Sequence, residues 1–524
     1  MLEKYRFDEQ ISRPDEAGLL YLVLGKFAGL DLRPEVVPNH AMGYVFEELL
    51  RRFSELSNET AGEHFTPREV IRLIVNLLFS EDSDVLTGAA PVRSIYDPAC
   101  GTGGMLNISD QYLTRLDAKA RPEMFGQEIN PETWAIARSD LLIRGQDPER
   151  IVLGNTLTAD GHADKRFDYA LANPPFGVDW NKSATTIKAE AASLGMDGRF
   201  GAGLPRVSDG SLLSLQQMIA RMKAPEDGGS RVAIVFSGSP LFAGAAESGE
   251  SNIRRWIIEN DWLEGIVALP DQLFYNTGIS TYVWIVTNRK RPERRGTVAL
   301  IDARGEWSKM RKSLGDKRKL LDDDHIAAVT RLSADAPLLA DDRVKVFDND
   351  TFGFRRITVE RPLRRRWTVT AEIVEAVASA KPVVALSVGD DDARRTHEAL
   401  LGALTDLVGT AEETEAAFTE RLLNACTARK QIGLAPGLKK AVLAAAAVTD
   451  PDAPVVANKK GEALPDPDLR DNGKVPLVED VDAYVDRLIH DGGEPDATRR
   501  RCDRAGRTAV RGTRRQARRR DRRS

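Results

Sequence analysis

Two short segments combine residue types that could hold a ligand and act on it. One covers residues 97–104 (DPACGTGG) and the other residues 173–177 (NPPFG). Glycines allow a tight turn and a close approach of the backbone to a ligand. The second segment offers two hydrogen-bond acceptors, the amide oxygen of Asn173 and a carbonyl held by Pro174 and Pro175, beside the ring of Phe176. Two acceptors suit one exocyclic amino group, and the ring suits a base stacked on it.

Glu128 follows the first segment at the end of the next predicted strand. An acidic residue about 20 residues beyond a glycine-rich loop accepts the hydroxyls of a bound ribose in dinucleotide sites, and we expect the same of Glu128. Asp97 could meet the ammonium of an amino acid. The alternative is structural: the glycines form an ordinary turn, Glu128 is a solvated strand end, and Asn-Pro-Pro is a turn that ends a strand.

The elements that position these residues alternate between short apolar runs and helical patterns. Strands are predicted at 94–98, 125–129, 150–155, 167–175, 231–237, 264–270, 281–288 and 297–303, and helices from Met105, from Pro131, at 211–222 and at 252–258. This alternation predicts a doubly wound, mostly parallel α/β sheet, whose ligands bind at the carboxyl ends of the strands. The link 289–296 is too short for a crossover helix, so the last two strands are predicted to form an antiparallel hairpin.

Composition narrows the class of protein. A chain of 524 residues is too long for one core, so at least two domains are expected. The charged start and the lack of a long apolar run predict a cytoplasmic protein with no membrane segment. Three cysteines and six scattered histidines argue against a disulfide framework and a metal site. Cys100, which has no histidine near it in the motif, is expected to be a small packing residue.

Charge is unevenly distributed along the chain. Residues 499–524 contain thirteen arginines and two aspartates, a charge of +11, whereas the whole chain carries −5, so the rest carries −16. An acidic body attracts a phosphate backbone poorly, so a nucleic-acid substrate requires a local basic groove or a partner subunit. The arginine-rich end is either a DNA-gripping arm or a shifted reading frame, and its Arg, Ala and Gly content favours the frameshift.

The order of the motifs resembles a known family. DPACGTGG followed by NPPF resembles the gamma class of amino-group DNA methyltransferases. Five further segments, GEHFTPREVIRLIVNLL, GQEINPETWAIARSDLLIRG, SDGSLLSLQQMIARM, ESNIRRWIIENDWLEGIVALP and FYNTGISTYVWIVTN, are similar to the modification subunit of type I restriction-modification systems. The resemblance covers about residues 20–362 and 468–486.

That resemblance implies S-adenosyl-L-methionine as cofactor, N6-methyladenine in DNA as product, and a Rossmann-like sheet of seven strands. It places the methionine end of the donor at Glu63, His64, Phe65, Thr66, Pro67 and Arg68. It places the glycine loop at Gly101, Thr102, Gly103 and Gly104, with Asp97 nearby, the ribose at Glu128 and the donor adenine at Asn155. It assigns the target base to Asn173, Pro174, Pro175 and Phe176.

The implied partners are double-stranded DNA, a specificity subunit and, as an open question, a restriction (translocase or nuclease) subunit, with two copies of the chain per complex. The chain has no second region suited to base recognition, so specificity is expected from another polypeptide. Three alternatives stay open: methylation of N4-cytosine or of a protein glutamine, a catalytically silent assembly subunit, and a solitary methyltransferase that recognises its own site.

The predicted organisation has six parts. They are an N-terminal helical domain that looks truncated against the family (1–80), the methyltransferase domain (81–304), a loop-rich extension (305–368), a helical C-terminal domain (369–450), a linker or arm (451–498) and the arginine-rich, disordered tail (499–524).

Overall fold

Neighbouring residues in the predicted strands pack into opposite cores of one sheet. In β1 (Ser94–Asp97), Ile95 belongs to one buried cluster and Tyr96 to the other. In β5 (Arg231–Phe236), Ala233 and Val235 face the first cluster. The alternate residues Val232, Ile234 and Phe236 face the second. Side chains of a strand alternate between the two faces, so a strand buried on both faces has a continuous apolar sequence. These runs therefore produce the doubly wound sheet that was predicted.

The computed structural model describes residues 7–33, 35–37, 42, 66–82, 93–117, 122–275, 277–314, 316–336, 338–429, 433–458, 460–490 and 509–510. Glu63, His64, Phe65 and nearly all of the arginine-rich tail, on which predictions were made, lie outside these residues. The chain divides into two compact units, Met1–Phe352 and Gly353–Ser524. None of the described helices has the length and apolar character needed to span a membrane.

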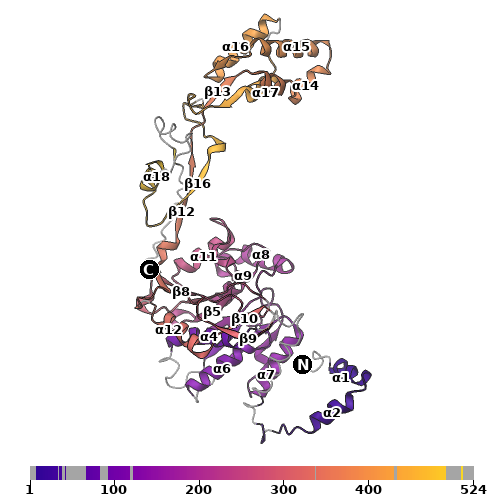
Figure 1. Cartoon of the computed structure of the whole chain (residues 1–524), viewed down its shortest axis with the longest axis vertical. Coiled ribbons are helices and arrows are strands. Elements are labelled where there is room, and N and C mark those ends of the chain that lie inside the picture. Colours follow the sequence, from indigo (N-terminus) through magenta and orange to yellow (C-terminus); the bar gives the residue numbers. More distant parts are fainter. Residues whose placement is uncertain are drawn as a thin grey trace. The chain divides into compact units, whose positions relative to one another are not determined.

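The first unit is built on a nine-stranded sheet, two strands more than the resemblance implied and one more than the apolar runs predicted (Figure 1). Its strand order is β11-β8-β6-β7-β5-β4-β1-β2-β3. The further strands are β2 (Glu123–Glu128), β3 (Ile151–Leu153), β4 (Tyr169–Ala172), β6 (Leu263–Ala268), β7 (Tyr282–Thr287), β8 (Thr297–Asp302) and β11 (Val344–Asp348). Five strand pairs are parallel, and β7 and β11 run antiparallel to their neighbours. β8 matches the strand predicted at 297–303, and β11 extends the predicted sheet beyond it at one edge.

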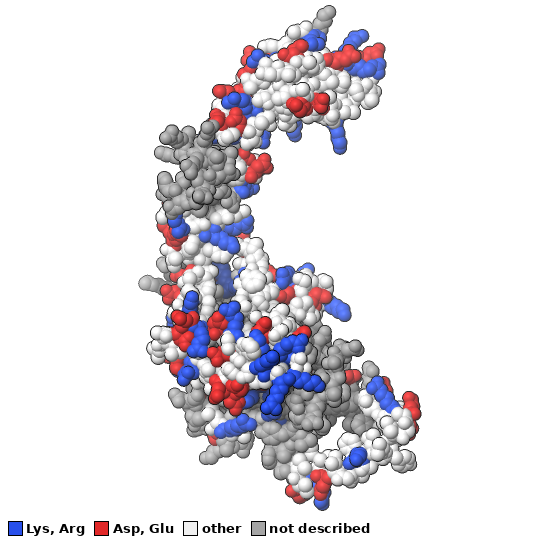
Figure 2. All heavy atoms as spheres, viewed as in Figure 1, with Lys and Arg blue, Asp and Glu red and all other residues white. Residues whose placement is uncertain are grey.

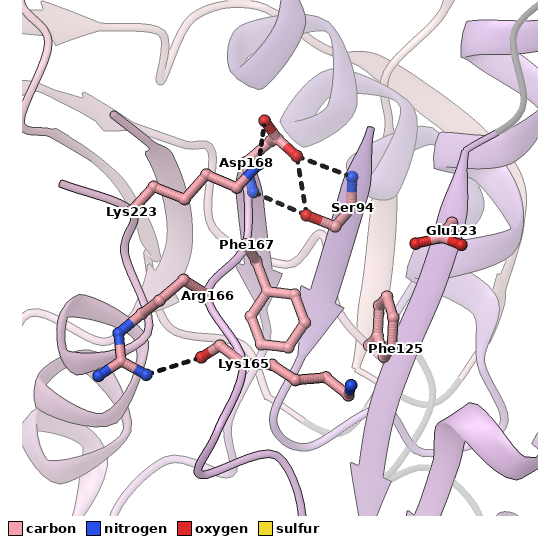
Figure 3. A pocket seen from close by; sticks show the side chains of 8 residues that line it. All are labelled: Ser94, Glu123, Phe125, Lys165, Arg166, Phe167, Asp168 and Lys223. Atoms are coloured by element: carbon pink, nitrogen blue, oxygen red, sulfur yellow. Dashed lines mark hydrogen bonds and ion pairs between the residues drawn. The ribbon is translucent and has the colours of Figure 1, made fainter. Parts of the chain in front are cut away.

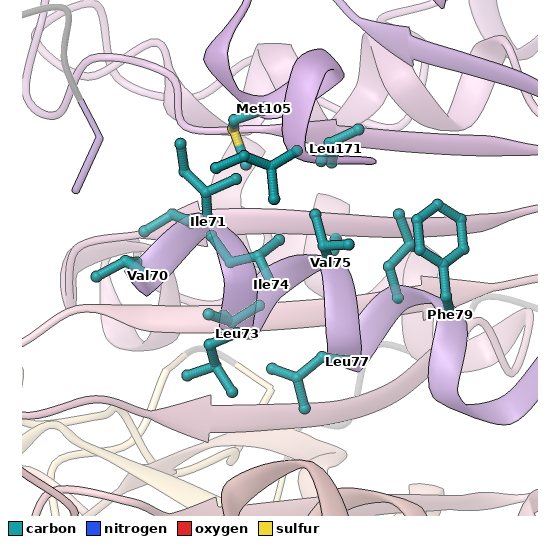
Figure 4. Close-up of a cluster of buried hydrophobic side chains, with 14 of the residues drawn as sticks. Val70, Ile71, Leu73, Ile74, Val75, Leu77, Phe79, Met105 and Leu171 are labelled. Atoms are coloured by element: carbon teal, nitrogen blue, oxygen red, sulfur yellow. The ribbon is translucent and has the colours of Figure 1, made fainter. Parts of the chain in front are cut away.

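Helices cover both faces of this sheet. One face packs against α4 (Arg68–Phe79), α6 (Gly104–Leu116), α7 (Pro131–Ile143) and α12 (Asp323–Ala334), and the other against α9 (Ser211–Ala220) and α11 (Gly249–Glu259). Eight of the twelve α4 residues are buried, and Figure 4 shows their side chains against the sheet and Met105. The unit also contains α1 (Phe7–Glu16), α2 (Leu20–Ala28), α8 (Ala184–Leu194) and α10 (Ser239–Phe242).

The predicted hairpin between the last two strands is wrong. β7 lies between β5 and β6, and β8 pairs with the far side of β6 in parallel. The link between β7 and β8 instead passes β6 and is held by buried ion pairs. Arg294 pairs with Glu81 at 2.9 Å and Arg289 with Asp82 at 2.7 Å, which ties the link to the end of α4. Charges buried in this way are stable only when paired, so the arginines determine the path of the link.

Charged residues after β8 form a second, two-stranded sheet of β9 (Ser308–Leu314) and β10 (Lys317–Leu320). Together with α12 and β11, this hairpin lies in the range that was predicted to be loop-rich. The second unit holds two three-stranded sheets, β16-β12-β17 and β14-β13-β15, and a helical cluster with its own core around Leu400, Phe418 and Val442. Its elements are β12 (Phe354–Glu360), β13 (Arg365–Thr368), α13 (Ala371–Ala378), α14 (Lys381–Ser387), α15 (Asp391–Asp406), β14 (Ala411–Glu412), α16 (Glu415–Ala428), α17 (Pro436–Ala446), β15 (Ala447–Thr449), β16 (Asp471–Pro476), α18 (Val481–His490) and β17 (Ala509–Val510).

Candidate functional site

The glycine-rich loop joins β1 to α6 and is fastened to the end of β2. Gly101 and Gly103 have positive φ angles of 54° and 84°, a conformation that glycine adopts without strain. The buried carboxylate of Glu128 accepts the backbone N–H of Gly101 at 2.8 Å and that of Asn130 at 2.7 Å. Glu128 therefore holds the turn that begins α6, and its position at the carboxyl end of β2 is the one predicted for a ribose ligand.

Asp97 lies at the end of β1, fully enclosed beside Glu128. Burial is the main cause that raises the pKa of Asp97 to about 8, and the negative charge of Glu128 raises this pKa further. The backbone N–H of Ala99 donates to the Asp97 carboxylate at 3.0 Å and lowers the pKa in part. A cationic group nearby favours the ionised form of such a carboxyl. The acidic pair at this edge therefore suits a ligand that carries positive charge.

Cys100 packs inside the loop, as predicted. Its side chain is 5% exposed and belongs to the core cluster. Burial raises the pKa of its thiol well above the usual value, and the charges of Asp97 and Glu128 act in the same direction. A Cβ at Gly126 would lie 2.9 Å from the Cys100 sulfur, so only glycine fits opposite it. A thiol that stays protonated is a poor nucleophile.

The segment after β3 reaches the same edge. Thr156 donates its hydroxyl to the Pro98 carbonyl at 2.6 Å, which ties this segment to the start of the glycine-rich loop. The Asn155 amide donates to the Ser183 hydroxyl at 3.0 Å and accepts the Leu157 N–H at 3.0 Å. Asn155, predicted to lie by the donor's adenine, is thus held in one orientation by two neighbours.

Asn173 follows β4 directly, and the nitrogen of its side-chain amide forms a hydrogen bond. Its Nδ2 donates to the hydroxyl of Thr66 at 2.8 Å, whereas its Oδ1 is buried and has no hydrogen-bond partner among the residues that the structure describes. A buried acceptor without a donor costs about 1–3 kcal/mol. Functional sites are a common reason for such a cost, because an incoming donor removes it. Asn173 therefore presents an oriented acceptor at the carboxyl end of β4.

Phe176 stands next to this acceptor, half-buried against the core. Its ring lies 6.3 Å from that of Phe274, edge to face, and Phe274 belongs to the loop between β6 and β7. Pro174 is buried and Pro175 is exposed. Phe274 was not among the predicted site residues, although it begins the segment FYNTGIST that carries part of the family resemblance.

Thr66, Pro67 and Arg68 stand at the start of α4. Thr66 is 9% exposed, and Arg68 reaches the side chain of Gln111 on α6 at 3.4 Å. Because β1 pairs in parallel with both β2 and β4, the ends of all three strands meet at one edge. The structure thus brings together Thr66, the glycine-rich loop, Glu128 and Asn173, which are far apart in the sequence.

A pocket of about 300 Å³ opens at the opposite edge of the sheet (Figure 3). It is lined by Ser94, Glu123, Phe125, Lys165, Arg166, Phe167, Asp168 and Lys223. The Asp168 carboxylate accepts the Ser94 hydroxyl at 2.8 Å and pairs with Lys223 at 2.8 Å. Its carboxylate is therefore satisfied within the pocket wall, and the pocket lies away from the glycine-rich loop and Asn173.

Comparison with known proteins gives a consistent match. The profile of the N-6 DNA methylase family matches residues 37–341. The HindI type I restriction enzyme methylase subunit of Haemophilus influenzae is 32% identical over 267 residues, 50% of this chain and 54% of that protein. The MjaIX methylase subunit of Methanocaldococcus jannaschii is 30% identical, over 59% of this chain and 51% of that protein.

A solved structure shares the fold. It is the type I restriction-modification system methyltransferase subunit from Streptococcus thermophilus, with a TM-score of 0.53 and 24% identity over 64% of this chain and 65% of that one. The chain spans about half the length of the curated relatives it matches.

Proposed function

The chain belongs to the N-6 DNA methylase family, and we propose that it transfers a methyl group from S-adenosyl-L-methionine to the N6 amino group of adenine in DNA. The observation that carries this proposal is the buried Oδ1 of Asn173, which has no hydrogen-bond partner within the described ranges and lies at the strand end beside the glycine-rich loop. We further propose that it acts as the modification subunit of a type I complex with a specificity subunit, because its relatives are type I methylase subunits.

The residues at the carboxyl ends of β1 and β2 fit the cofactor. Asp97 and Glu128 are both acidic and buried, which suits a ligand with an ammonium and a sulfonium. The carboxylate of Glu128 can accept ribose hydroxyls in addition to the two N–H groups it holds, since a carboxylate offers about four acceptor sites. The glycines leave the backbone of the loop open to a ligand.

The chemistry that S-adenosyl-L-methionine supplies when bound is an electrophilic methyl group on sulfur. Asn173 and the carbonyl of Pro174 would each accept one hydrogen of the target amino group, and Phe176 would stack on the base. These bonds orient the amino nitrogen and raise its electron density, which is catalysis by positioning and electrostatics. With the donor bound, the N–CH₃ bond would form as the S–CH₃ bond breaks, and the proton of the cationic amino group held by Asn173 would leave to water. No base among the side chains is required.

The decisive experiment is transfer of a labelled methyl group to DNA, by the chain alone and with a type I specificity subunit from the same organism, followed by nucleoside analysis. Label in N6-methyladenine supports the proposal. Label in N4-methylcytosine or in protein would assign another substrate to the same acceptor. Donor binding without transfer under any of these conditions would favour the silent assembly subunit.

A further inference from the structure

The hairpin of β9 and β10 concentrates positive charge on a chain whose net charge is negative. Residues 308–320 contain six lysines and arginines against the single acid Asp316, while the whole chain carries −5. In Figure 2, which has the view of Figure 1, Lys and Arg side chains gather over the place where β9 and β10 lie. In the register of the hairpin, Lys309 stands directly opposite Lys319. Like charges in such a position destabilise a hairpin.

Two of the six cations have structural partners. Lys317 is buried, pairs with Glu69 on the first turn of α4 and donates to the Leu273 carbonyl at 2.8 Å. Lys319 pairs with Asp271 and lies 4.2 Å from the centre of the Trp307 ring. The remaining four form no ion pair with any described residue and are exposed: Lys309, Arg311, Lys312 and Arg318. The structure thus leaves four charges of one sign available on one small element.

The hairpin is fastened beside the candidate site. The backbone N–H groups of Arg318 and Lys319 donate to the Gln272 carbonyl at 2.9 and 3.2 Å, and that of Asp316 donates to the Tyr275 carbonyl at 2.9 Å. Gln272 and Tyr275 belong to the loop whose Phe274 contacts Phe176. Glu69, the partner of Lys317, stands three residues after Thr66. The strand before the hairpin, β8, is parallel to β6 and also ends at this edge.

We propose that the β9–β10 hairpin binds the phosphate backbone of DNA beside the target base, through Lys309, Arg311, Lys312 and Arg318. This rests on the proposed function, which makes DNA the substrate. A base turned out of the duplex reaches the site only if its flanking backbone is held close to it. Contacts to phosphates position a protein on DNA without reading sequence. Four cations without ion-pair partners among the described residues, next to the acceptor of the target base, supply that contact and offset the acidity of the rest of the chain.

The test replaces the four residues together, K309Q/R311Q/K312Q/R318Q. Each side chain is exposed, so the fold and donor binding are expected to be unchanged, and thermal unfolding and calorimetry with S-adenosyl-L-methionine check this. Binding to a labelled random-sequence 30-base-pair duplex is then measured by anisotropy between about 50 and 200 mM salt. We expect Kd at about 100 mM salt to rise about ten-fold or more, and the slope of log Kd against log salt to fall by about 0.9 for each phosphate that the variant no longer neutralises.

The matched control neutralises four exposed arginines toward the opposite edge of the sheet, R115Q/R166Q/R295Q/R331Q. This variant removes the same formal charge, and its Kd and salt slope are expected to stay within about two-fold of the unaltered chain. A similar loss of affinity in both variants would mean that total charge, not the hairpin, binds DNA.

The methylation assay separates this inference from the proposed function. The hairpin variant should show a raised KM for DNA with kcat nearly unchanged at low salt. If the unaltered chain with its specificity protein methylates DNA and the hairpin variant keeps the same Kd, salt slope and KM, the inference is wrong and the function stands. If the variant instead fails to associate with the specificity protein, the hairpin is a protein-binding surface. If the unaltered complex neither binds nor methylates DNA, both proposals fail.

Discussion

Replacing Asn173 by alanine should separate activity from stability. Within the part of the chain that the structure describes, the side chain makes one hydrogen bond, from Nδ2 to Thr66 at 2.8 Å, and buries Oδ1 without a partner. Removing the bond costs about 0.5–1.5 kcal/mol of folding free energy, whereas removing an unsatisfied buried acceptor returns about 1–3 kcal/mol. The two effects nearly cancel, so the melting temperature of Asn173→Ala should be unchanged or higher.

Methyl transfer should respond very differently to the same substitution. The amide oxygen is expected to accept a hydrogen of the target amino group in the transition state. Loss of one such oriented group costs about 3 kcal/mol, which is a fall in kcat of about 10²–10³-fold. Donor affinity should stay within about three-fold, because Asn173 is placed at the target base and the predicted donor residues lie on neighbouring strands.

Single-turnover transfer of labelled methyl to DNA, calorimetry with the donor, and thermal unfolding test these statements together. Asn76→Ala is the control, since this amide lies on α4 ten residues after Thr66 and donates to the Arg72 carbonyl of its own helix at 2.7 Å; its activity should be unchanged. Full activity in Asn173→Ala would remove the residue from the reaction. A loss of activity that is matched by a loss of stability would assign Asn173 to the fold.

Four further substitutions test the other parts of the site. Thr66→Val removes the group that orients the Asn173 amide while keeping its shape, and kcat should fall about five- to ten-fold, with donor affinity as the control. Glu128→Ala should weaken donor binding in calorimetry by about 1.5–3 kcal/mol, and unchanged affinity would place the ribose elsewhere. The pKa of Asp97 is raised to about 8, so its contribution to stability should decrease as the pH rises from the usual range of an aspartate to about 8. A cationic donor should release a proton on binding below that pH, which calorimetry in two buffers detects and Asp97→Asn abolishes. Gly126→Ala should destabilise the fold by about 1–3 kcal/mol in chemical unfolding, because its Cβ would lie 2.9 Å from the Cys100 sulfur and from Ile151. An unchanged denaturant midpoint would show that the glycine-rich loop moves to accommodate the methyl group at little cost.

Local patterns were sufficient for most elements of the first unit. The predicted strands at 94–98 and 231–237 match β1 and β5 within two residues, and the helix predicted at 211–222 matches α9. The reason is that burial on both faces leaves a continuous apolar run in a strand, and burial on one face leaves a helical period. The position of the glycine-rich loop, of Glu128 and of Asn173 at strand ends follows from the same patterns.

These local patterns could not predict contacts between distant segments. The insertion of β7 between β5 and β6 depends on pairing across the sheet and on the ion pairs of Arg289 and Arg294, so a short link wrongly predicted a hairpin. The charged run 308–320 has no apolar period, yet it forms β9 and β10 because the β6–β7 loop supplies carbonyls for its backbone. The packing of Phe274 on Phe176 was missed for the same reason.

The sequence by itself determined which residue types are available for chemistry and which ends of strands carry them, because these depend on composition and on periods of a few residues. Only the tertiary structure decided how they act together. Thr66 and Asn173 are 107 positions apart, and the hydrogen bond from the Asn173 Nδ2 to Thr66 orients the amide, whose Oδ1 is left without a partner among the described residues. The pKa of Asp97 likewise depends on burial by segments far away in the chain. Such pairings depend on how α4 packs against the sheet. A local stretch of sequence contains only one of the two partners, so it cannot predict the pair.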